Sequence, residues 1–339
     1  MDSVTQIALG AAVGEVVLGK KVGNKAVLWG AVAGTIPDLD VIPGFFMDTV
    51  ARLDFHRGFS HSILLCLILA PILGALIEKI HRQENASRWD WTRLVFWSLF
   101  THPLLDCFTT WGTQLFWPFE YRVAFKSIFV IDPLYTLPLI VCVIWLLFKG
   151  RGSQIRRKIN IIGLTLSSGY LLLTLVNKQI MNQNFKNILQ NQNIEYFRFT
   201  TQPTPANNVL WSGTAETKDG FYIGYHSFLD NQEDTPFLYF KKNHQLLGEM
   251  AENEKVEKLI ALTNGYFIVD SSENGVTISD LRFGLINGWA TESSEFVFAY
   301  NLQVPKNNTN QQLIIRQKRA SINVSSAMLR QFWMRIKGT

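Results

Sequence analysis

Long apolar runs fill the first half of this 339-residue chain, whereas the second half has the composition of a soluble domain. Six runs precede residue 178, at residues 4–19, 26–45, 62–78, 94–112, 128–148 and 159–177. A helix that spans a membrane needs about 20 consecutive apolar residues. We therefore expect a membrane-embedded α-helical domain at residues 1–177, with about six apolar segments, followed by a soluble α+β domain at residues 178–339.

The apolar runs differ in length and continuity. Several are short or interrupted by proline, so the first and third are expected to be tilted, partly inserted or buried against neighbouring helices. The first two contain closely spaced glycines, in "GAAVGEVVLG" and "GAVAGTIP". Small residues let helix backbones approach one another within a membrane. This spacing predicts close packing of the first two helices.

Basic residues gather in three loops between the apolar runs. The loops are "KKVGNK", "EKIHRQENASRWDWTR" and "KGRGSQIRRK". Lys and Arg are enriched in loops that face the cytoplasm. All three loops predict the same orientation, so the C-terminal domain is expected outside the cytoplasm, after an even number of spans. The chain is thus predicted to be a multi-pass protein of the lipid bilayer.

Charge and cysteine content exclude other classes of protein. The net charge is +5, and no basic stripe is interleaved with aromatic residues, so nucleic acid is not expected as a partner. The three cysteines form no CxxC pair. Neither a zinc ribbon nor a disulfide scaffold is therefore predicted.

The polar second half has the pattern of alternating helices and hairpins. "NKQIMNQNFKNILQNQN" predicts an amphipathic linker helix, and turns at Asp219-Gly220 and Asn274-Gly275 predict two hairpins. "FVFAYNLQV" predicts a further strand. "LLGEMAENEKVEKLIALTNG" predicts a helix that stops at Gly265, and "SSAMLRQFWMRIKG" a closing helix. No catalytic constellation stands out, so this domain is expected to cover the membrane site, recognise substrate or bind a partner.

Acidic residues and histidines recur where the predicted segments reach the outer side of the membrane. His102 and Asp106 are four residues apart on a predicted helix, so both project from one face. Two further pairs lie on other segments, in "PDLD" (Asp38 and Asp40) and in "FHRGFSH" (His56 and His61). Segments that are distant in sequence thus bring carboxylates and imidazoles to the same side.

This combination of side chains predicts a metal site. Carboxylate and neutral imidazole are ligands of zinc, manganese and iron. A charged side chain at membrane depth costs about 2.5–3.5 kcal/mol, so six such residues are costly unless they share a purpose. Zinc is the expected ion, with manganese or iron as alternatives. The competing interpretation is a set of separate helix caps and interfacial hydrogen bonds.

Four other residues have two interpretations each. Arg57 could bind an anionic substrate group or anchor the chain at the lipid interface. Glu15 lies in an apolar run and needs a partner, as a catalytic base near the metal or in a salt bridge between helices. Ser60 is expected to cap a helix rather than act as a nucleophile. Asp132 either takes part in the function or caps the fifth helix.

Five motifs together resemble the LexA-regulated, inner-membrane metal-dependent hydrolase family of bacteria. They are "MDSVTQIALGAAVGE", "GTIPDLDV", "FHRGFSHS", "HPLLDCFTTWGTQLFWPF" and "IDPLY", which cover about residues 1–150. The resemblance implies a hydrolase of the bacterial inner membrane with a metal held by Asp38, Asp40, His56, His61, His102 and Asp106. Gln6 departs from the family pattern, which often resembles "THA" at this position, so no role for a histidine carries over.

Two classes of function remain open. The first is a metal-dependent hydrolase whose activated water attacks an ester or phosphoester, lipid-linked in one version, at the outer membrane face. The second is a non-enzymatic membrane transporter or scaffold. A transporter is expected to distribute acidic residues through the membrane depth, but the last two apolar runs hold only Asp132. This distribution favours the enzyme.

Overall fold

The computed structural model describes residues 1–230, 235–272, 275–289, 295–303, 313–318 and 325–338. The chain forms two compact units. The first unit comprises Met1–Phe45, Phe55–Asn177 and Pro205–Asn207, and the second comprises Phe46–Asp54, Lys178–Thr204 and Asn208–Thr339. The short segment Phe46–Asp54 therefore belongs to the second unit, although it lies within the sequence range expected for the membrane domain.

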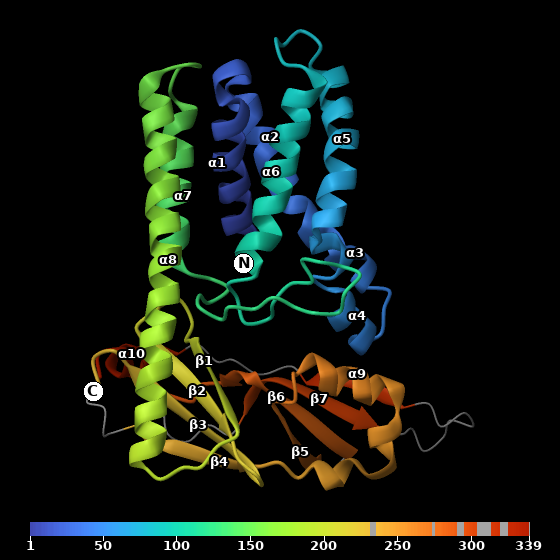
Figure 1. Ribbon diagram of the computed structural model, residues 1–339, viewed down its shortest axis with the longest axis vertical. Helices are drawn as coiled ribbons and strands as arrows, with labels where there is room; N and C mark the ends of the chain where they lie inside the picture. The colour runs from blue at the N-terminus through green and yellow to red at the C-terminus, as the bar shows by residue number, and fades with distance from the viewer. Residues whose placement is uncertain (231–234, 273–274, 290–294, 304–312, 319–324, 339) are drawn as a thin grey trace. The chain divides into compact units, whose positions relative to one another are not determined.

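The first unit is a bundle of helices (Figure 1). Each of the six apolar runs overlaps one of them: α1 (Ser3–Val22), α2 (Asn24–Thr35), α5 (Ile63–Ile80), α6 (Arg88–Asp106), α7 (Pro133–Leu147) and α8 (Gln154–Asn191). Among the described residues, three stretches are long and apolar enough to cross a membrane: Asn24–Gly44, Ile63–Ile80 and Gln154–Asn191. The expectation of six spans is therefore not confirmed, and α7 is only 15 residues long.

The fourth and fifth apolar runs are helical over only part of their length. α6 ends at Asp106, so residues 107–112 lie in the loop that follows it. α7 begins at Pro133, with Asp132 as its N-cap, because the Asp132 carboxylate accepts a hydrogen bond from the amide of Leu134. Proline fits the first helical position since its missing amide hydrogen is not needed there.

The close packing predicted for the first two helices is confirmed. A Cβ atom added at Gly10 of α1 would lie 2.4 Å from the carbonyl oxygen of Gly30 in α2. One added at Gly14 would lie 2.3 Å from the carbonyl oxygen of Ala26. No side chain fits at such distances, so the glycines are what allows these two backbones to touch.

The two ends of the bundle differ in what they carry. The turns that join α1 to α2, α5 to α6 and α7 to α8 lie at one end (Figure 1). At the other end lie the N-terminus, the loop after α6 and two short helices that follow α2. These are η1 (Ile36–Asp40) and α3 (Val41–Gly44); a further single turn, η2 (Phe59–His61), precedes α5.

The second unit contains two four-stranded antiparallel sheets with consecutive strand order. The first sheet is β1 (Arg198–Pro203), β2 (Leu210–Glu216), β3 (Gly220–Ser227) and β4 (Phe237–Lys241); the second is β5 (Phe267–Ser272), β6 (Gly275–Leu285), β7 (Phe296–Gln303) and β8 (Ile314–Lys318). The hairpin predicted at Asp219-Gly220 is confirmed, since β2 pairs with β3. β5 pairs with β6, but Asn274 of the other predicted turn lies outside the described residues.

The helices predicted in the second unit form with one difference. The linker helix is the end of α8, and the closing helix is α10 (Ser326–Ile336). The helix expected before Gly265 is divided into η3 (His244–Glu252) and α9 (Glu254–Leu262). The division falls at Asn253, which has an extended backbone and caps α9 by accepting a hydrogen bond from the amide of Lys255. A kink at Gly248, which has a positive φ of 49°, lies within η3 itself.

The segment from the first half of the chain packs firmly within the second unit. It contains most of α4 (Thr49–Phe55). Val50 is 2% exposed and belongs to a hydrophobic core with Leu247 and Val256. Lys255 forms an ion pair with Asp48 at 2.8 Å. Sequence patterns do not reveal this placement, because the partners are about two hundred residues away in the chain.

Candidate metal centre

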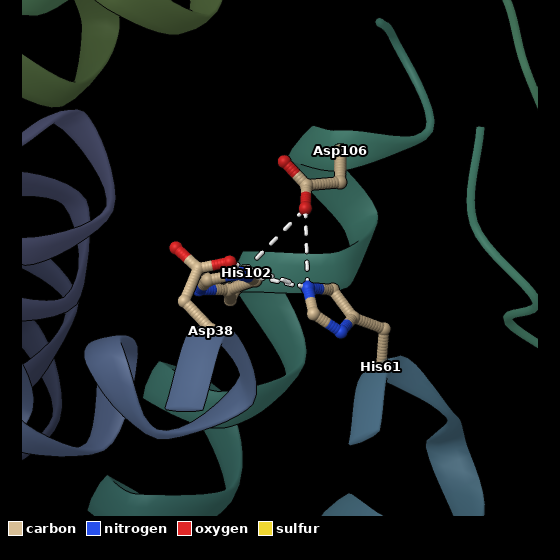
Figure 2. Close-up of side chains that lie close together, drawn as sticks. All are labelled: Asp38, His61, His102 and Asp106. Carbon is tan, nitrogen blue, oxygen red and sulfur yellow. Dashed lines mark hydrogen bonds and ion pairs between the residues drawn. The ribbon is translucent and has the colours of Figure 1, made fainter. Parts of the chain in front are cut away.

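Four side chains from three elements meet at the end of the bundle where the N-terminus lies. Asp38 comes from η1, His61 from η2, and His102 and Asp106 from the last turns of α6. Figure 2 shows Asp38 and His61 directed toward the turn of α6 that carries the other two. One ligand atom from each residue lies within 4.8 Å of the other three. This is the only group of potential metal ligands found among the described residues.

The distances within this cluster match a metal coordination sphere. His61 Nε2 lies 3.2 Å from His102 Nε2 and 3.4 Å from Asp106 Oδ2. Asp38 Oδ1 lies 3.5 Å from His61 Nε2 and 3.3 Å from His102 Nε2. Asp106 Oδ2 lies 3.5 Å from His102 Nε2. Four ligands placed tetrahedrally at 2.0–2.1 Å from a zinc ion are separated by about 3.3–3.4 Å, so these separations fit one ion.

The hydrogen bonds of the two imidazoles direct their lone pairs into the cluster. His102 Nδ1 lies 2.6 Å from the carbonyl oxygen of Gly34, which can only accept, so Nδ1 carries the proton. Ser60 Oγ donates to Asp40 at 2.8 Å and therefore accepts from His61 Nδ1, also at 2.8 Å. In both rings the neutral form leaves the lone pair on Nε2, which is the atom that faces the cluster.

Four electron-rich atoms thus face one another in a buried space. The side chains of His61, His102 and Asp106 are fully buried, and that of Asp38 is 17% exposed. Asp106 Oδ2 is buried and makes no hydrogen bond of acceptable geometry among the described residues. Buried acceptors without donors are costly. A bound divalent cation, or a second proton on one imidazole, has to offset their mutual repulsion, and the donor set fits the cation.

Asp40 and His56, both predicted as ligands, lie beside the cluster rather than in it. Asp40 Oδ1 is 3.0 Å from His56 Nδ1. Asp40 Oδ2 accepts from the amide of Arg57 at 3.0 Å and from Ser60. Both carboxylate oxygens are therefore engaged by other groups. Through Ser60, Asp40 orients His61, in the way that carboxylates commonly orient metal-binding histidines.

Arg57 and Gln6 hold Asp106 in place. Arg57 Nε is 3.1 Å from Asp106 Oδ2, and Arg57 Nη1 donates to Thr109 Oγ1 at 2.7 Å. Gln6 Nε2 donates to Asp106 Oδ1 at 3.0 Å, and the amino nitrogen of Met1 also contacts that oxygen. Arg57 is only 5% exposed. It therefore does not anchor the chain at the lipid interface; it neutralises part of the charge on Asp106.

The remaining candidates have structural partners. Glu15 accepts two hydrogen bonds from the Arg156 guanidinium, at 2.7 and 2.5 Å, and makes no contact with the four-residue cluster. Asp132 caps α7 and accepts from Tyr170 at 2.9 Å. Ser60 does not cap a helix; the N-cap of α5 is Ser62, whose hydroxyl accepts from the amide of Leu65.

Sequence reasoning missed the parts of the site that belong to the backbone or to neutral side chains. These are the carbonyl of Gly34, the hydroxyl of Ser60 and the amide of Gln6. Only Ser60 had a signal, because it is adjacent to His61 in the sequence. Gln6 occupies the position at which the sequence departs from the pattern of the resembling family.

A known protein family matches the N-terminal region that contains the cluster. The model of the YdjM inner membrane protein family matches residues 1–181, which include the whole cluster and all candidate spans except the end of α8. No solved structure matches the chain.

Two relatives match part of the chain. The uncharacterized protein YfhP of Bacillus subtilis (strain 168) is 31% identical over 183 residues, which are 51% of this chain and 51% of that protein. The inner membrane protein YbcI of Escherichia coli (strain K12) is 33% identical over 101 residues, 30% of this chain and 57% of that protein. The chain thus spans little more than half the length of either relative. By its match over residues 1–181, the chain belongs to the YdjM inner membrane protein family.

Proposed function

We propose that the chain is a membrane-bound, metal-dependent hydrolase that cleaves an ester or phosphoester. The observation that supports this most is the cluster of Asp38, His61, His102 and Asp106. Three of these side chains are fully buried, and the separations between each imidazole Nε2 and the other ligand atoms are 3.2–3.5 Å. A divalent cation held there, most simply zinc, would lower the pKa of a bound water to about 7 and polarise the substrate. Manganese or iron would suit the same donors.

Asp38 has the best position for proton transfer. Its Oδ1 atom faces the cluster, whereas its Oδ2 atom lies outside, with Ser3 Oγ at 3.5 Å. Its side chain is the one member of the cluster that reaches the surface. A water beside the cluster can therefore give a proton to Asp38 Oδ2 while it attacks the substrate. Substrate has to approach from this side, because the other three side chains are fully buried.

Arg57 acts by positioning rather than by binding substrate in this proposal. Its guanidinium is directed at Asp106 and Thr109, so it keeps the Asp106 carboxylate ionised and aimed at the cluster. Glu15 has no part in the chemistry, since both of its oxygens are bound by Arg156.

The orientation proposed from the basic loops puts the site on the outer face of the membrane. The turns with the basic sequences and the cluster lie at opposite ends of the bundle (Figure 1). A cysteine introduced at Ser153, between α7 and α8, should be protected from an impermeant thiol reagent in intact cells. One introduced at the exposed Lys218 of the second unit should react. The native cysteines are buried and give little background. The opposite labelling would put the site in the cytoplasm.

The experiment that tests the hydrolase is turnover by Asp38→Asn. This change preserves the size of the side chain but removes its charge and its capacity to accept a proton. Wild type and variant, at equal abundance in membranes, are offered carboxyester and phosphoester substrates, including lipids. Loss of a proton acceptor typically lowers the rate by about 100- to 10,000-fold. His244→Ala, in the second unit, is the control and should retain full activity. Wild-type turnover by Asp38→Asn would refute the proposed chemistry.

One observation favours a second candidate, a non-enzymatic scaffold with a structural metal. Four protein ligands complete a tetrahedron, and closed four-ligand sites are typical of structural zinc. In that case the wild type binds metal but turns over none of the substrates. Loss of Asp38 then lowers the stability of the bundle without any change in catalysis. A transporter has less support, because the cluster lies at one end of the bundle.

A further inference from the structure

Large apolar side chains are exposed on the two segments that adjoin the cluster. One segment is η1 with α3, and the other is the loop after α6. We use the name collar for six exposed side chains on these segments or directly after them: Leu39, Ile42, Phe45, Phe116, Phe119 and Tyr121. Phe45 is 77% exposed, Phe119 72% and Tyr121 71%. A soluble protein rarely exposes so many large apolar groups together.

The collar and the cluster are parts of the same short elements. Asp38 and Leu39 are neighbours in η1; the carboxylate of Asp38 faces the cluster, whereas Leu39 is 48% exposed. Ile42 and Phe45 follow within two turns. Asp38, a proposed metal ligand, therefore lies directly beside whatever surrounds these exposed side chains.

The loop that carries the aromatic part of the collar is fixed to the segment that carries His61. The amide of Gln114 donates to the carbonyl of Arg57, and the amide of Ile63 donates to the carbonyl of Leu115, both at 3.0 Å. Arg122 Nη1 donates to the carbonyl of His56 at 3.0 Å. These bonds lie on both sides of Phe116, Phe119 and Tyr121 in the sequence, so two backbone bonds and the Arg122 side chain hold this loop beside the segment that carries His61.

A lipid bilayer is the occupant that fits this surface. The candidate span Asn24–Gly44 contains Leu39 and Ile42 and ends one residue before Phe45, so this part of the collar lies at the end of a stretch that is apolar enough to cross a membrane. Aromatic residues, Tyr and Trp above all, gather where membrane proteins cross the boundary between lipid and water. The match to a family of inner membrane proteins points to the same environment.

We propose that the collar lies in the interface of the bilayer and that the substrate is an amphiphile of that bilayer. Its ester or phosphoester group reaches Asp38 from the headgroup layer, while its apolar chain lies against Leu39 and Phe119. The substrate class rests on the proposed hydrolase; the immersion of the collar does not. In the reaction, water supplies a hydroxyl to the acyl or phosphoryl group and a proton to the alcohol that leaves.

The immersion is tested with spin labels on the full chain in vesicles of phosphatidylethanolamine and phosphatidylglycerol. The variants Phe119→Cys and Phe45→Cys carry the label, and Lys218→Cys is the control in the second unit. Both collar labels should collide more with oxygen, which concentrates in lipid, than with a water-soluble nickel chelate. The control label should show the reverse. Collar labels as open to the chelate as the control would overturn the proposal.

The substrate class is tested with two esters that share a headgroup, one long-chained in the vesicles and one short-chained in solution. Phe119→Ser should lower turnover of the long-chain ester about tenfold and leave the short-chain ester unchanged. Phe197→Ser, with an equally exposed ring in the second unit, should affect neither. Preference of the wild type for the short-chain ester would refute the amphiphile but keep the hydrolase. Turnover of neither ester would refute the hydrolase and the substrate class together.

Discussion

The bundle contains two buried polar clusters, the Glu15–Arg156 pair and the group of four around His102, and they differ in how their polar atoms are paired. Where Glu15 meets Arg156, every charge has a partner of opposite character: Arg156 donates to both oxygens of Glu15, to Asn24 and to two backbone carbonyls. In the cluster around His102, acceptors face acceptors. Burial of charge is common to both. In the second cluster, Arg57, Gln6 and Met1 engage Asp106 from outside, but among the described residues no donor lies between the inward-facing atoms of His61, His102 and Asp38. This inward deficit is what a bound cation would offset.

The largest expected effect concerns the satisfied pair. Glu15→Ala leaves the Arg156 guanidinium, which is 2% exposed, without its counter-ion. Removing one partner of a buried ion pair typically costs about 3–5 kcal/mol of stability. Denaturation in detergent should reveal this loss, while the amount of bound metal per folded protein stays the same.

The matched control is the double variant Glu15→Leu with Arg156→Met, which removes both charges and keeps much of the volume. Such replacements are often neutral or stabilising. A single variant as stable as the wild type would show that the pair is not a structural unit. Loss of metal in either variant would show that metal binding depends on the Glu15–Arg156 pair, so the two clusters would not be independent.

A smaller effect is expected from the groups that orient the ligands. Ser60→Ala removes the hydroxyl between Asp40 and His61, so His61 is free to adopt other tautomers and ring orientations. Loss of such a partner typically lowers metal affinity about 10- to 100-fold. Competition with a chelator of known affinity measures the change.

Ser62→Ala is a neighbouring control with a different expected outcome. Ser62 caps α5, so its loss should cost about 1 kcal/mol of stability and leave metal affinity unchanged. Equal affinity losses in the two variants would mean that the whole segment, rather than the Asp40–Ser60–His61 chain, supports the site.

The sequence allowed the residue types of the site to be predicted better than their roles. His102 and Asp106 were expected on one helix face because four residues make about one turn, and the structure places both in the cluster. Asp38 and Asp40 lie in η1, a 3₁₀ helix of only five residues, and the sequence pattern does not tell which carboxylate faces the cluster. Asp40 instead orients His61. For Glu15 the sequence indicated only that a partner was needed, since Arg156 is 141 positions further along the chain.

In the fold, too, features set by neighbouring residues could be predicted, whereas contacts between residues far apart in the sequence could not. Hydrophobic runs, helix caps and the Asp219-Gly220 turn act over a few residues, so the helices and the first hairpin could be predicted. The membership of Phe46–Asp54 in the second unit depends on Val50 packing with Val256, and on Lys255 pairing with Asp48. Such contacts leave no local pattern.

The smallest expected effect comes from a third buried imidazole, in the second unit. His226 is 1% exposed, and its Nδ1 lies 2.8 Å from Thr235 Oγ1. Burial holds the pKa of His226 below its ordinary value of about 6.5. The unfolded chain therefore binds a proton more readily, so the second unit should lose stability as the pH falls below about 6.5.

Hydrogen exchange of the β3 amides at pH 5 and pH 7 measures this change in the full chain. His226→Gln should reduce the pH dependence, whereas the cluster in the first unit should be unaffected by that substitution. A pH dependence that persists unchanged in His226→Gln would assign it to another group. His226 would then no longer be an example of a buried, neutral imidazole with a hydrogen-bond partner, to be compared with His61 and His102.

The central claim is that the unsatisfied cluster holds a divalent metal, and elemental analysis of the full chain purified in detergent tests it most directly. The wild type should contain about one equivalent of zinc, manganese or iron, or take it up on dialysis. His102→Ala removes one of the four ligand atoms and should lower this content sharply, while His244→Ala should leave it unchanged. Wild-type protein that neither contains nor takes up metal, or His102→Ala that binds as much as the wild type, would contradict the claim.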